Sequence, residues 1–398
     1  MATTTNFGWT TPDDTDLVKN GALAIRTLGQ SIDTSLIDLK GGTTGQVLSK
    51  ASNTDLDYTW VAGSASAVNK NYLINGSFAI AQRGTSFTAG TNNDDAYTLD
   101  RWYVLSDGND IIDVTQEAGT VPTGGQYAIA LDVETVNKKF AIATIIENKD
   151  CLGLVGQTAT FSFKAKVSAT TKLDNVKAAI VAWSGTADTV TSDIISAWNV
   201  EGTNPTLIAN ATYENTPANL SVTTNYATYS VSAAIDTAST QNLILLVWSD
   251  VTDTTLGDFL YVAQAKLELG STATSFISAG DTTQGELAAC QRYYYRNTAT
   301  ANYSQLLNYA FAYNSSIPAA NVQFMVPMRT TPSSIEFSNI AFERYDNTKY
   351  AVSSILLGSG TPNGIWVYGT ASGLTANDVG RWVSNNTTSA YFAFNAEL

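Results

Sequence analysis

Residues 71–104 read NYLINGSFAIAQRGTSFTAGTNNDDAYTLDRWYV and open what we expect to be the first large domain of this 398-residue chain. Their apolar positions come in short bursts, separated by Asn75-Gly76, Arg83-Gly84 and a polar stretch from Gly90 to Asp95. Turn-forming residues at such short intervals are typical of strands joined by tight connections, not of a helix. The stretch therefore predicts strand, turn, strand and loop.

From about residue 70 to residue 278 the chain repeats a period-two alternation of apolar and polar residues. The apolar sets are Phe161, Phe163, Ala165 and Val167 in one segment, and Phe259, Tyr261, Ala263, Ala265, Leu267 and Leu269 in another. Such alternation indicates strands with one buried and one wet face. The unbroken apolar run NLILLVW, at 242–248, suits a central strand covered on both faces. About eight strands predict a jelly-roll-like β-sandwich over 70–278.

The last part of the chain predicts a second, smaller β-sandwich domain over 285–398. A polar segment at 278–284 marks the boundary, and a short helical turn is expected just after it. Alternation then returns at Val322, Phe324, Val326 and Met328, and Ala390–Leu398 reads as a last strand. The chain is thus expected to be mainly β.

A single long helix is predicted near the N-terminus, over about 12–40. Thr11 and Pro12 suit a helix start, and Gly41-Gly42 suits its end. An apolar seam at heptad spacing runs along it, formed by Val18, Ile25, Leu28, Ile32 and Leu39. Such a narrow stripe implies a partner helix, and no other long amphipathic helix is evident, so we expect self-association as a coiled-coil-like homotrimer. The alternative is packing on the chain's own residues.

Between this helix and the sandwich we expect a hairpin over about 45–62 and a short linker at 63–68, GSASAV. Two strands bury little surface, so the hairpin should dock on the rest of the segment or on the next domain. Residues 1–65 are therefore taken as one N-terminal segment.

Composition excludes several classes of function. A net charge of −14 repels phosphate and anionic lipid, so neither nucleic acid nor a membrane is an expected partner. No apolar run is long enough for a membrane span, and the N-terminus lacks the pattern of a signal peptide. The two cysteines, Cys151 and Cys290, lie far apart and read as buried thiols.

The chain has no histidine, which excludes Ser-His-Asp and Cys-His catalysis and His-ligated zinc. Phosphate-binding glycine motifs are also missing. We therefore expect no cofactor, no metal and no enzymatic activity.

Neighbouring carboxylates leave a glycosidase or depolymerase as an alternative. The two sets are Asp94, Asp95 and Asp100, and Asp250, Asp253 and Asp258, although loop aspartates beside Thr, Gly and Asn are typical of solvated turns. Asp107-Gly108-Asn109-Asp110 is read as a turn rather than a calcium loop. Arg101 and Trp102 form either a ligand-facing pair or, as we prefer, a surface pair of Arg101 with Asp100 beside a core tryptophan.

Several of these runs resemble tail-fibre and receptor-binding proteins of tailed bacteriophages. The resemblance is carried by LINGSFAIAQRGTSF at 73–87 with YTLDRW at 97–102, by AKLELGSTATSF at 265–276, and by ELAACQRYYYR at 286–296. The N-terminal TTTNFGWTTPDD and LVKNGALAIRTLG also resemble such proteins. The resemblance implies a virion tail component, whose residues 1–65 attach to other phage tail proteins and whose sandwich is carbohydrate-binding-module-like.

On this basis we expect a tail fibre that binds host cell-surface carbohydrate without cleaving it, with residues 285–398 as the receptor-binding tip. The alternatives are a purely structural adaptor or capsid decoration protein, and a polysaccharide depolymerase.

The candidate ligand-binding residues are Trp366, Tyr368 and Trp382. In NGIWVYG at 363–369, Ile365 and Val367 would face the core if this is a strand, so Trp366 and Tyr368 would face outward. Trp382 lies on a following segment that is expected to be adjacent. Flat aromatic rings offer stacking faces to a neutral sugar. The competing interpretation buries these rings in the core or against a neighbouring subunit.

Overall fold

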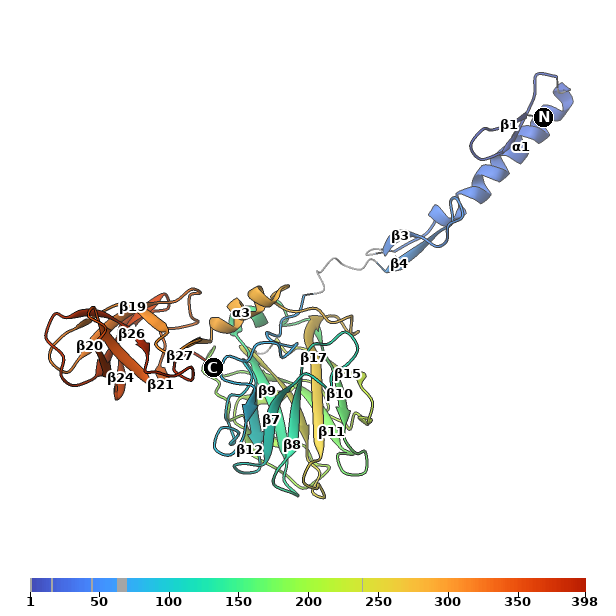
Figure 1. The fold of residues 1–398 in the computed structure, drawn as a ribbon. Helices are drawn as coiled ribbons and strands as arrows, with labels where there is room; N and C mark the ends of the chain where they lie inside the picture. The colour runs from blue at the N-terminus through green and yellow to red at the C-terminus, as the bar shows by residue number, and fades with distance from the viewer. Residues whose placement is uncertain (1, 16, 44–45, 63–69, 238) are drawn as a thin grey trace. The chain divides into compact units, whose positions relative to one another are not determined.

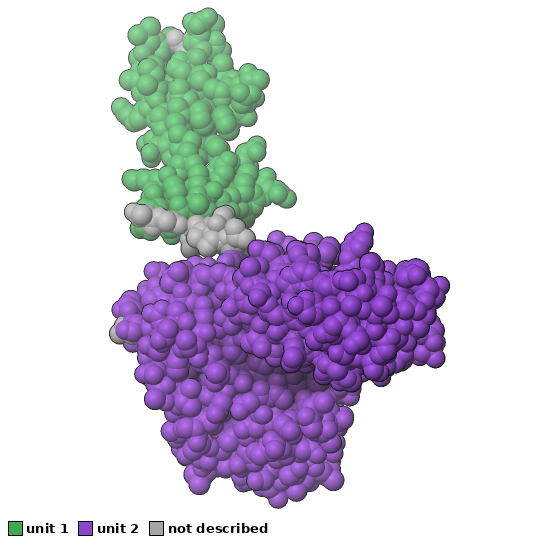
Figure 2. Space-filling view, turned by 90° about the vertical axis from the view of Figure 1, so that its left-hand side faces the viewer, with its two compact units in different colours: residues 1–69 green, residues 70–398 purple. Residues whose placement is uncertain are grey.

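The computed structural model describes residues 2–15, 17–43, 46–62, 70–237 and 239–398. It is mostly β, with 39% of residues in strands and 9% in helices, arranged in β-sandwich-like sheets (Figure 1). The chain forms two compact units, residues 1–69 and 70–398 (Figure 2). The linker predicted at 63–68 lies outside the described residues.

The first unit holds a helix between two hairpins. Its strands are β1 (Ala2–Thr3), β2 (Thr10–Thr11), β3 (Gln46–Lys50) and β4 (Tyr58–Ala62); its helices are α1 (Val18–Ser35) and the 3₁₀ turn η1 (Ile37–Leu39). β1 pairs with β2 and β3 with β4, both antiparallel.

The predicted helix start at Thr11-Pro12 is wrong. The β-branched Thr10 and Thr11 lie in a strand, so the helix begins only at Val18, and Leu17 before it provides no side-chain cap. The predicted end at Gly41-Gly42 is also late, since α1 ends at Ser35. The indole of Trp9 donates to the Ser35 hydroxyl at 3.1 Å, so the N-terminal hairpin packs on the helix.

Two antiparallel sheets form a sandwich in the first part of the second unit. The six-stranded sheet has the order β15-β10-β17-β8-β7-β5 and the five-stranded sheet β14-β11-β16-β9-β6. The bounds are β5 Ser86–Phe87, β6 Tyr103–Ser106, β7 Ile112–Glu117, β8 Ala128–Val133, β9 Phe140–Ile146, β10 Thr158–Val167, β11 Val176–Trp183, β14 Ala211–Tyr213, β15 Ala227–Ala234, β16 Asn242–Ser249 and β17 Phe259–Leu269. Apolar side chains of both sheets, such as Phe161 and Val247, share one core.

The five-stranded sheet is covered on its other face as well. A second cluster, which includes Trp183, Ile194 and Trp248, packs there beside the small hairpin β12 (Ile195–Ala197) and β13 (Thr206–Leu207). All eight residues of β16 are buried, as the unbroken apolar run predicts. A four-residue helix, α2 (Asn148–Cys151), follows β9.

A β-bulge corrects the predicted faces of β17. Ala263 pairs with Lys164 and Lys266 pairs with Ser162, so two residues of β17 oppose Phe163 alone. The extra residue reverses the alternation. Leu260 and Val262 therefore face the core before the bulge and Ala265 and Leu267 after it, while Phe259 and Tyr261, predicted inward, stack together outside the core with ring centroids 5.4 Å apart.

The last part of the chain carries its own core. After α3 (Thr283–Gln291), a three-stranded sheet has the order β18-β27-β21 and a seven-stranded sheet the order β23-β22-β26-β19-β20-β25-β24. The bounds are β18 Tyr294–Thr298, β19 Gln305–Ala312, β20 Pro318–Gln323, β21 Ser334–Ser338, β22 Ile340–Arg344, β23 Lys349–Ala351, β24 Ser354–Thr361, β25 Gly364–Thr370, β26 Val379–Ser384 and β27 Tyr391–Asn395 (orange to red in Figure 1).

The two sheets of this part face each other across their core, which includes Phe392 and Phe394 from one and Phe342 and Val367 from the other. The predicted strand alternation through Met328 is wrong, because β20 ends at Gln323. Both cysteines are buried and free, as expected.

Candidate functional site

Trp366 and Tyr368 lie on β25 and point away from the core. Ile365 precedes Trp366, Val367 lies between Trp366 and Tyr368, and both aliphatic residues are buried. Trp366 is half-buried and Tyr368 is 37% exposed. The two rings stack, with centroids 6.4 Å apart and planes 21° apart. Phe311 meets the Trp366 ring edge to face at 6.1 Å. The pair therefore presents aromatic surface on the outer face of the seven-stranded sheet.

This aromatic pair belongs to a longer apolar row. Strand register aligns Leu356 with Tyr368, Tyr368 with Ala319, Ala319 with Phe311, and Phe311 with Val379. Directly paired residues share a face, so the row crosses β24, β25, β20, β19 and β26, about 19 Å at the usual strand spacing. Leu356 is 70% exposed and Val379 61%. We call Leu356, Tyr368, Trp366, Phe311 and Val379 the aromatic row.

Strand β19 reverses the usual placement of large and small side chains. Ala310 and Ala312 are buried, whereas Tyr309 is 88% exposed and Phe311 is half-buried on the opposite face. Large aromatic residues are normally the buried ones. The period-two run Tyr309, Phe311, Tyr313 was the sequence signal for this surface, and our sequence analysis missed it.

A cavity of about 400 Å³ adjoins the end of the row at Val379 and Tyr309. Glu343 lies in it and accepts hydrogen bonds from Arg381 at 2.5 Å and Lys349 at 2.8 Å. Burial raises the pKa of Glu343, but these two cations outweigh it and leave the pKa below its ordinary value. The carboxylate therefore stays ionised beside two cations, and the site combines apolar rings with charged and amide donors.

Trp382 is not part of this surface, which corrects the prediction. Its side chain is fully buried and packs on Phe392 with ring centroids 5.3 Å apart. Val379 of the same strand faces outward, and a residue three positions later must face the other way. The structure brings Trp366 and Tyr368 together but places Trp382 in the core.

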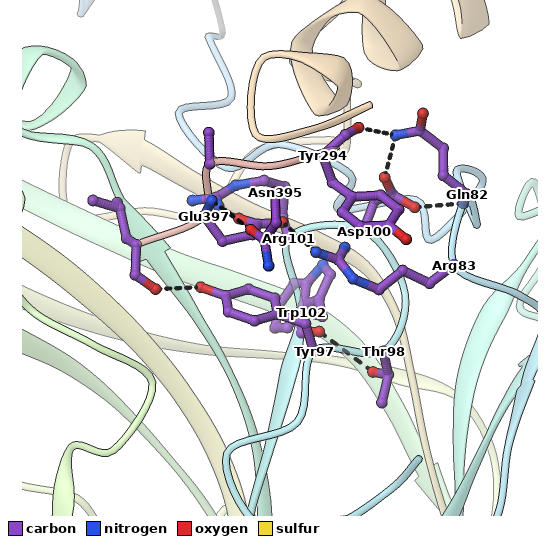
Figure 3. A network of polar contacts seen from close by, with 12 residues as sticks. Gln82, Arg83, Tyr97, Thr98, Asp100, Arg101, Trp102, Tyr294, Asn395 and Glu397 are labelled. Atoms are coloured by element: carbon purple, nitrogen blue, oxygen red, sulfur yellow. Dashed lines mark hydrogen bonds and ion pairs between the residues drawn. The ribbon is translucent and has the colours of Figure 1, made fainter. Parts of the chain in front are cut away.

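The run YTLDRW at 97–102 is a packing element instead of a ligand site (Figure 3). Trp102 is fully buried, as the interpretation of it as a core tryptophan predicts, and its indole donates to the Asn75 carbonyl at 3.1 Å. The predicted surface pair of Asp100 with Arg101 is wrong, since both side chains are buried and each has another partner. Asp100 accepts hydrogen bonds from the backbone and side-chain amides of Gln82.

Arg101 pairs with Glu397, near the C-terminus of the chain. The guanidinium also lies over the ring of Tyr293 at 3.6 Å and donates to the Ile145 carbonyl. The neighbouring Tyr97 hydroxyl donates to the Leu398 carbonyl at 2.9 Å. These contacts join the sandwich to the last residues of the chain, and we call Arg83, Arg101 and Glu397 the C-terminal lock.

Asn75 and Gly76 of the opening stretch have a structural role too. Asn75 adopts φ of +58° and its side chain donates to the carbonyls of Ile80 and Asp100. A Cβ on Gly76 would lie 1.9 Å from the Ala265 carbonyl oxygen, so only glycine allows β17 to pass this close. The motifs that carry the family resemblance thus specify packing.

The carboxylate sets singled out from the sequence do not converge on one site. Asp94 accepts from the Ser106 amide at 2.7 Å, Asp250 pairs with Lys177 at 3.1 Å, and Asp258 accepts from the Thr255 amide at 2.7 Å. Burial, with Asp94 and Asp193, raises the pKa of Asp95 to about 6. Among the described residues no group of three or more acidic or cysteine side chains is placed to hold a metal ion.

On α1 the predicted seam is partly uncovered within the single chain: Val18 is 97% exposed and Ile25 65%, whereas Leu28 and Ile32 are half-buried. Leu39, the last predicted seam residue, lies beyond α1 in the turn η1 and is 41% exposed. None of the described helices has the length and apolar content needed to cross a membrane.

Comparison with known proteins adds only distant likenesses. No family model and no curated protein matches the chain. Among solved structures, the enzymatically active domain of tailspike protein 4 from bacteriophage CBA120 is similar at 13% identity and TM-score 0.30, over 50% of this chain and 21% of that one. The CBM22-1 xylan-binding domain of Paenibacillus barcinonensis Xyn10C is similar at 12% and 0.26, over 47% and 99%. A family 16 carbohydrate-binding module is similar at 14% and 0.25, over 40% and 85%.

Proposed function

We propose that this protein is a homotrimeric tail fibre of a bacteriophage virion that attaches to host surface glycans by non-catalytic binding. The aromatic row on the seven-stranded sheet is the glycan-binding surface. Residues 1–65 attach the fibre to other tail proteins and, through the seam on α1, assemble three copies.

The observation that carries the binding proposal is that β19 turns the aromatic side chains of Tyr309 and Phe311 outward, while its alanines face the core. Exposed apolar surface in a contiguous patch marks a contact site. The row is flanked by amide and hydroxyl groups: Asn321 pairs with Trp366, and the Ser354 hydroxyl meets the Thr370 hydroxyl at 2.8 Å. Sugar rings present an apolar C–H face and hydroxyl edges, which match such a combination.

Assembly into a trimer is supported by the exposed heptad residues of α1. Leaving Val18 and Ile25 in water costs free energy that burial against a second and third copy would recover. Three linked copies also strengthen weak individual binding, because each further site acts at an effective concentration near millimolar.

The test of the glycan site is Trp366→Ala in the intact protein, scored for adsorption to host cells, thermal stability and oligomer mass. Loss of the stacking face should abolish or strongly reduce adsorption and leave stability and mass unchanged. If stability falls or the oligomer dissociates, Trp366 is a core or interface residue and the surface has been assigned wrongly.

A matched pair of leucines provides the control. Leu356→Ser alters the aromatic row, whereas Leu256→Ser alters a leucine of nearly equal exposure, 68% against 70%, on the sandwich. Only the first should weaken adsorption. Release of reducing sugar from host polysaccharide by the wild type would favour a depolymerase instead.

A further inference from the structure

A second cavity, of about 560 Å³, opens on the sandwich, along the outward side of β10 and β17. Its volume lies within the roughly 300–1,000 Å³ of small-molecule sites. Ser162, Lys164 and Thr228 line it, together with the core residue Phe163. On β10, Ser162 and Lys164 alternate with the buried Phe161 and Ala165. None of these residues belongs to the aromatic row.

The bulge in β17 places Gln264 in the wall of this cavity. Gln264 has φ of +50°, which is uncommon for a residue other than glycine. A bulge re-aims a side chain that a regular strand would direct elsewhere. The strained backbone is thus at a residue that lines the cavity.

Several polar groups around the cavity have no partner in the part of the chain that the structure describes. The side chains of Gln264, Ser162 and Thr228 make no hydrogen bond there, although Ser162 is only 4% exposed. None of their polar atoms is among the described buried atoms that lack a partner, so water reaches them. They open on the same hollow, where the hydroxyls of a ligand would take the place of that water.

Lys164 gives the cavity a positive charge. Its ammonium donates to the Thr123 carbonyl at 3.3 Å and has no ion pair among the described residues. By contrast, the ammonium of buried Lys266 lies 2.9 Å from Glu268. A lysine without an ion pair in a cavity favours an anionic ligand locally, against the repulsion from the chain's net charge of −14.

The far wall is held in place before any ligand arrives. Glu268 accepts from the Thr274 amide at 2.8 Å, and Lys266 donates to the Ser275 carbonyl at 3.0 Å. This fixes the segment that carries Phe276, which lines the cavity. A preformed wall lowers the entropy cost of binding.

We propose that this cavity binds an acidic sugar residue, that is, a pyranose ring bearing one carboxylate. Lys164 pairs with the carboxylate, the amide of Gln264 and the hydroxyls of Ser162 and Thr228 bond ring hydroxyls, and Phe276 packs on the C–H face. The proposal goes beyond glycan attachment at the aromatic row, since it adds a second site on another core and a charged ligand class.

The test is calorimetric titration of the full chain with D-glucuronate, with D-glucose as the neutral counterpart. Glucuronate should bind saturably and at least tenfold more tightly than glucose, and more weakly as salt is raised. Lys164→Gln should weaken glucuronate binding about ten- to a hundredfold, the usual worth of a hydrogen bond to a charged group. Lys164→Arg should retain most of it.

Lys166→Gln is the matched control, because Lys166 lies on the same strand face two residues away and does not line the cavity. Lys166→Gln and Trp366→Ala should both bind glucuronate as the wild type does, so failure at the aromatic row is distinguishable from failure here. The proposal is overturned if glucuronate does not bind, if glucose binds equally, if Lys164→Gln binds as the wild type, or if Lys166→Gln loses as much.

Discussion

Removing the carboxylate of Glu397 should destabilise the unit formed by residues 70–398 by about 3–5 kcal/mol. The side chains of Arg101 and Glu397 are 2% and 4% exposed, so their pairing takes place away from water. In Glu397→Ala the Arg101 guanidinium would keep only the Ile145 carbonyl and the Tyr293 ring, and Arg83 would also lose its ion pair at 3.3 Å. An unpaired buried cation accounts for the size of the loss.

Urea denaturation followed by tryptophan fluorescence measures this effect. The matched control is Asp253→Ala, which breaks the exposed pair of Lys172 and Asp253 and should cost less than about 1 kcal/mol. Replacing Arg101 and Glu397 together by methionine should cost less than Glu397→Ala alone, since the buried Arg101 guanidinium is then not left unpaired and only Arg83 loses an ion pair. If Glu397→Ala costs no more than the surface control, the lock is hydrated and the reasoning fails.

Three further predictions concern pH and assembly. Burial, together with repulsion from the carboxylates of Glu134, Asp113 and Asp258, raises the pKa of Asp132 from 3.8 to about 6. Stability should therefore fall as pH rises from about 4 to about 6. Asp132→Asn should raise the melting temperature at pH 8 but not at pH 3.5. The dependence of stability on pH is opposite at Glu147. Burial raises its pKa, but hydrogen bonds from Arg292 and Tyr293 outweigh burial and lower the pKa below 4.5. The stabilising effect of Glu147 should therefore vanish as pH falls below 4.5, and Glu147→Gln should remove that dependence. Ile25→Asp should dissociate the trimer in mass photometry, whereas Leu23→Asp, at similar exposure off the seam, should not; a monomeric wild type would contradict the assembly.

Local sequence pattern predicts the strands well where side-chain size and burial agree. The apolar run of β16 and the alternation of β10 correspond to the observed burial, because both follow directly from which face meets a core. The start of α1 could not be predicted in this way. Thr11 suits a helix cap and a strand equally, and pairing with Ala2–Thr3 decides between them.

Contacts between distant residues leave no local trace in a single sequence. Arg101 and Glu397 are separated by almost the whole of the second unit, so nothing near YTLDRW identifies the acid that pairs with it. The prediction that Trp382 faces outward failed for a related reason, because the face on which it lies is set by the register of β26 against its neighbouring strands. Trp382 and Trp366 are the same residue type, yet Trp382 lies in the core and Trp366 lies at the surface.

The two candidate sites lie where the local rules are broken. Gln264 sits at a bulge with strained backbone, and β19 turns its alanines inward and its aromatic rings outward. Such conflicts cost stability and are expected to persist where binding requires them. The C-terminal lock joins the cores that carry these sites, so sugars of one glycan bound at both would act as linked ligands, with affinities that reinforce each other. Breaking the lock should therefore weaken attachment to a glycan with acidic and neutral residues more than binding of glucuronate alone, which needs only the sandwich cavity.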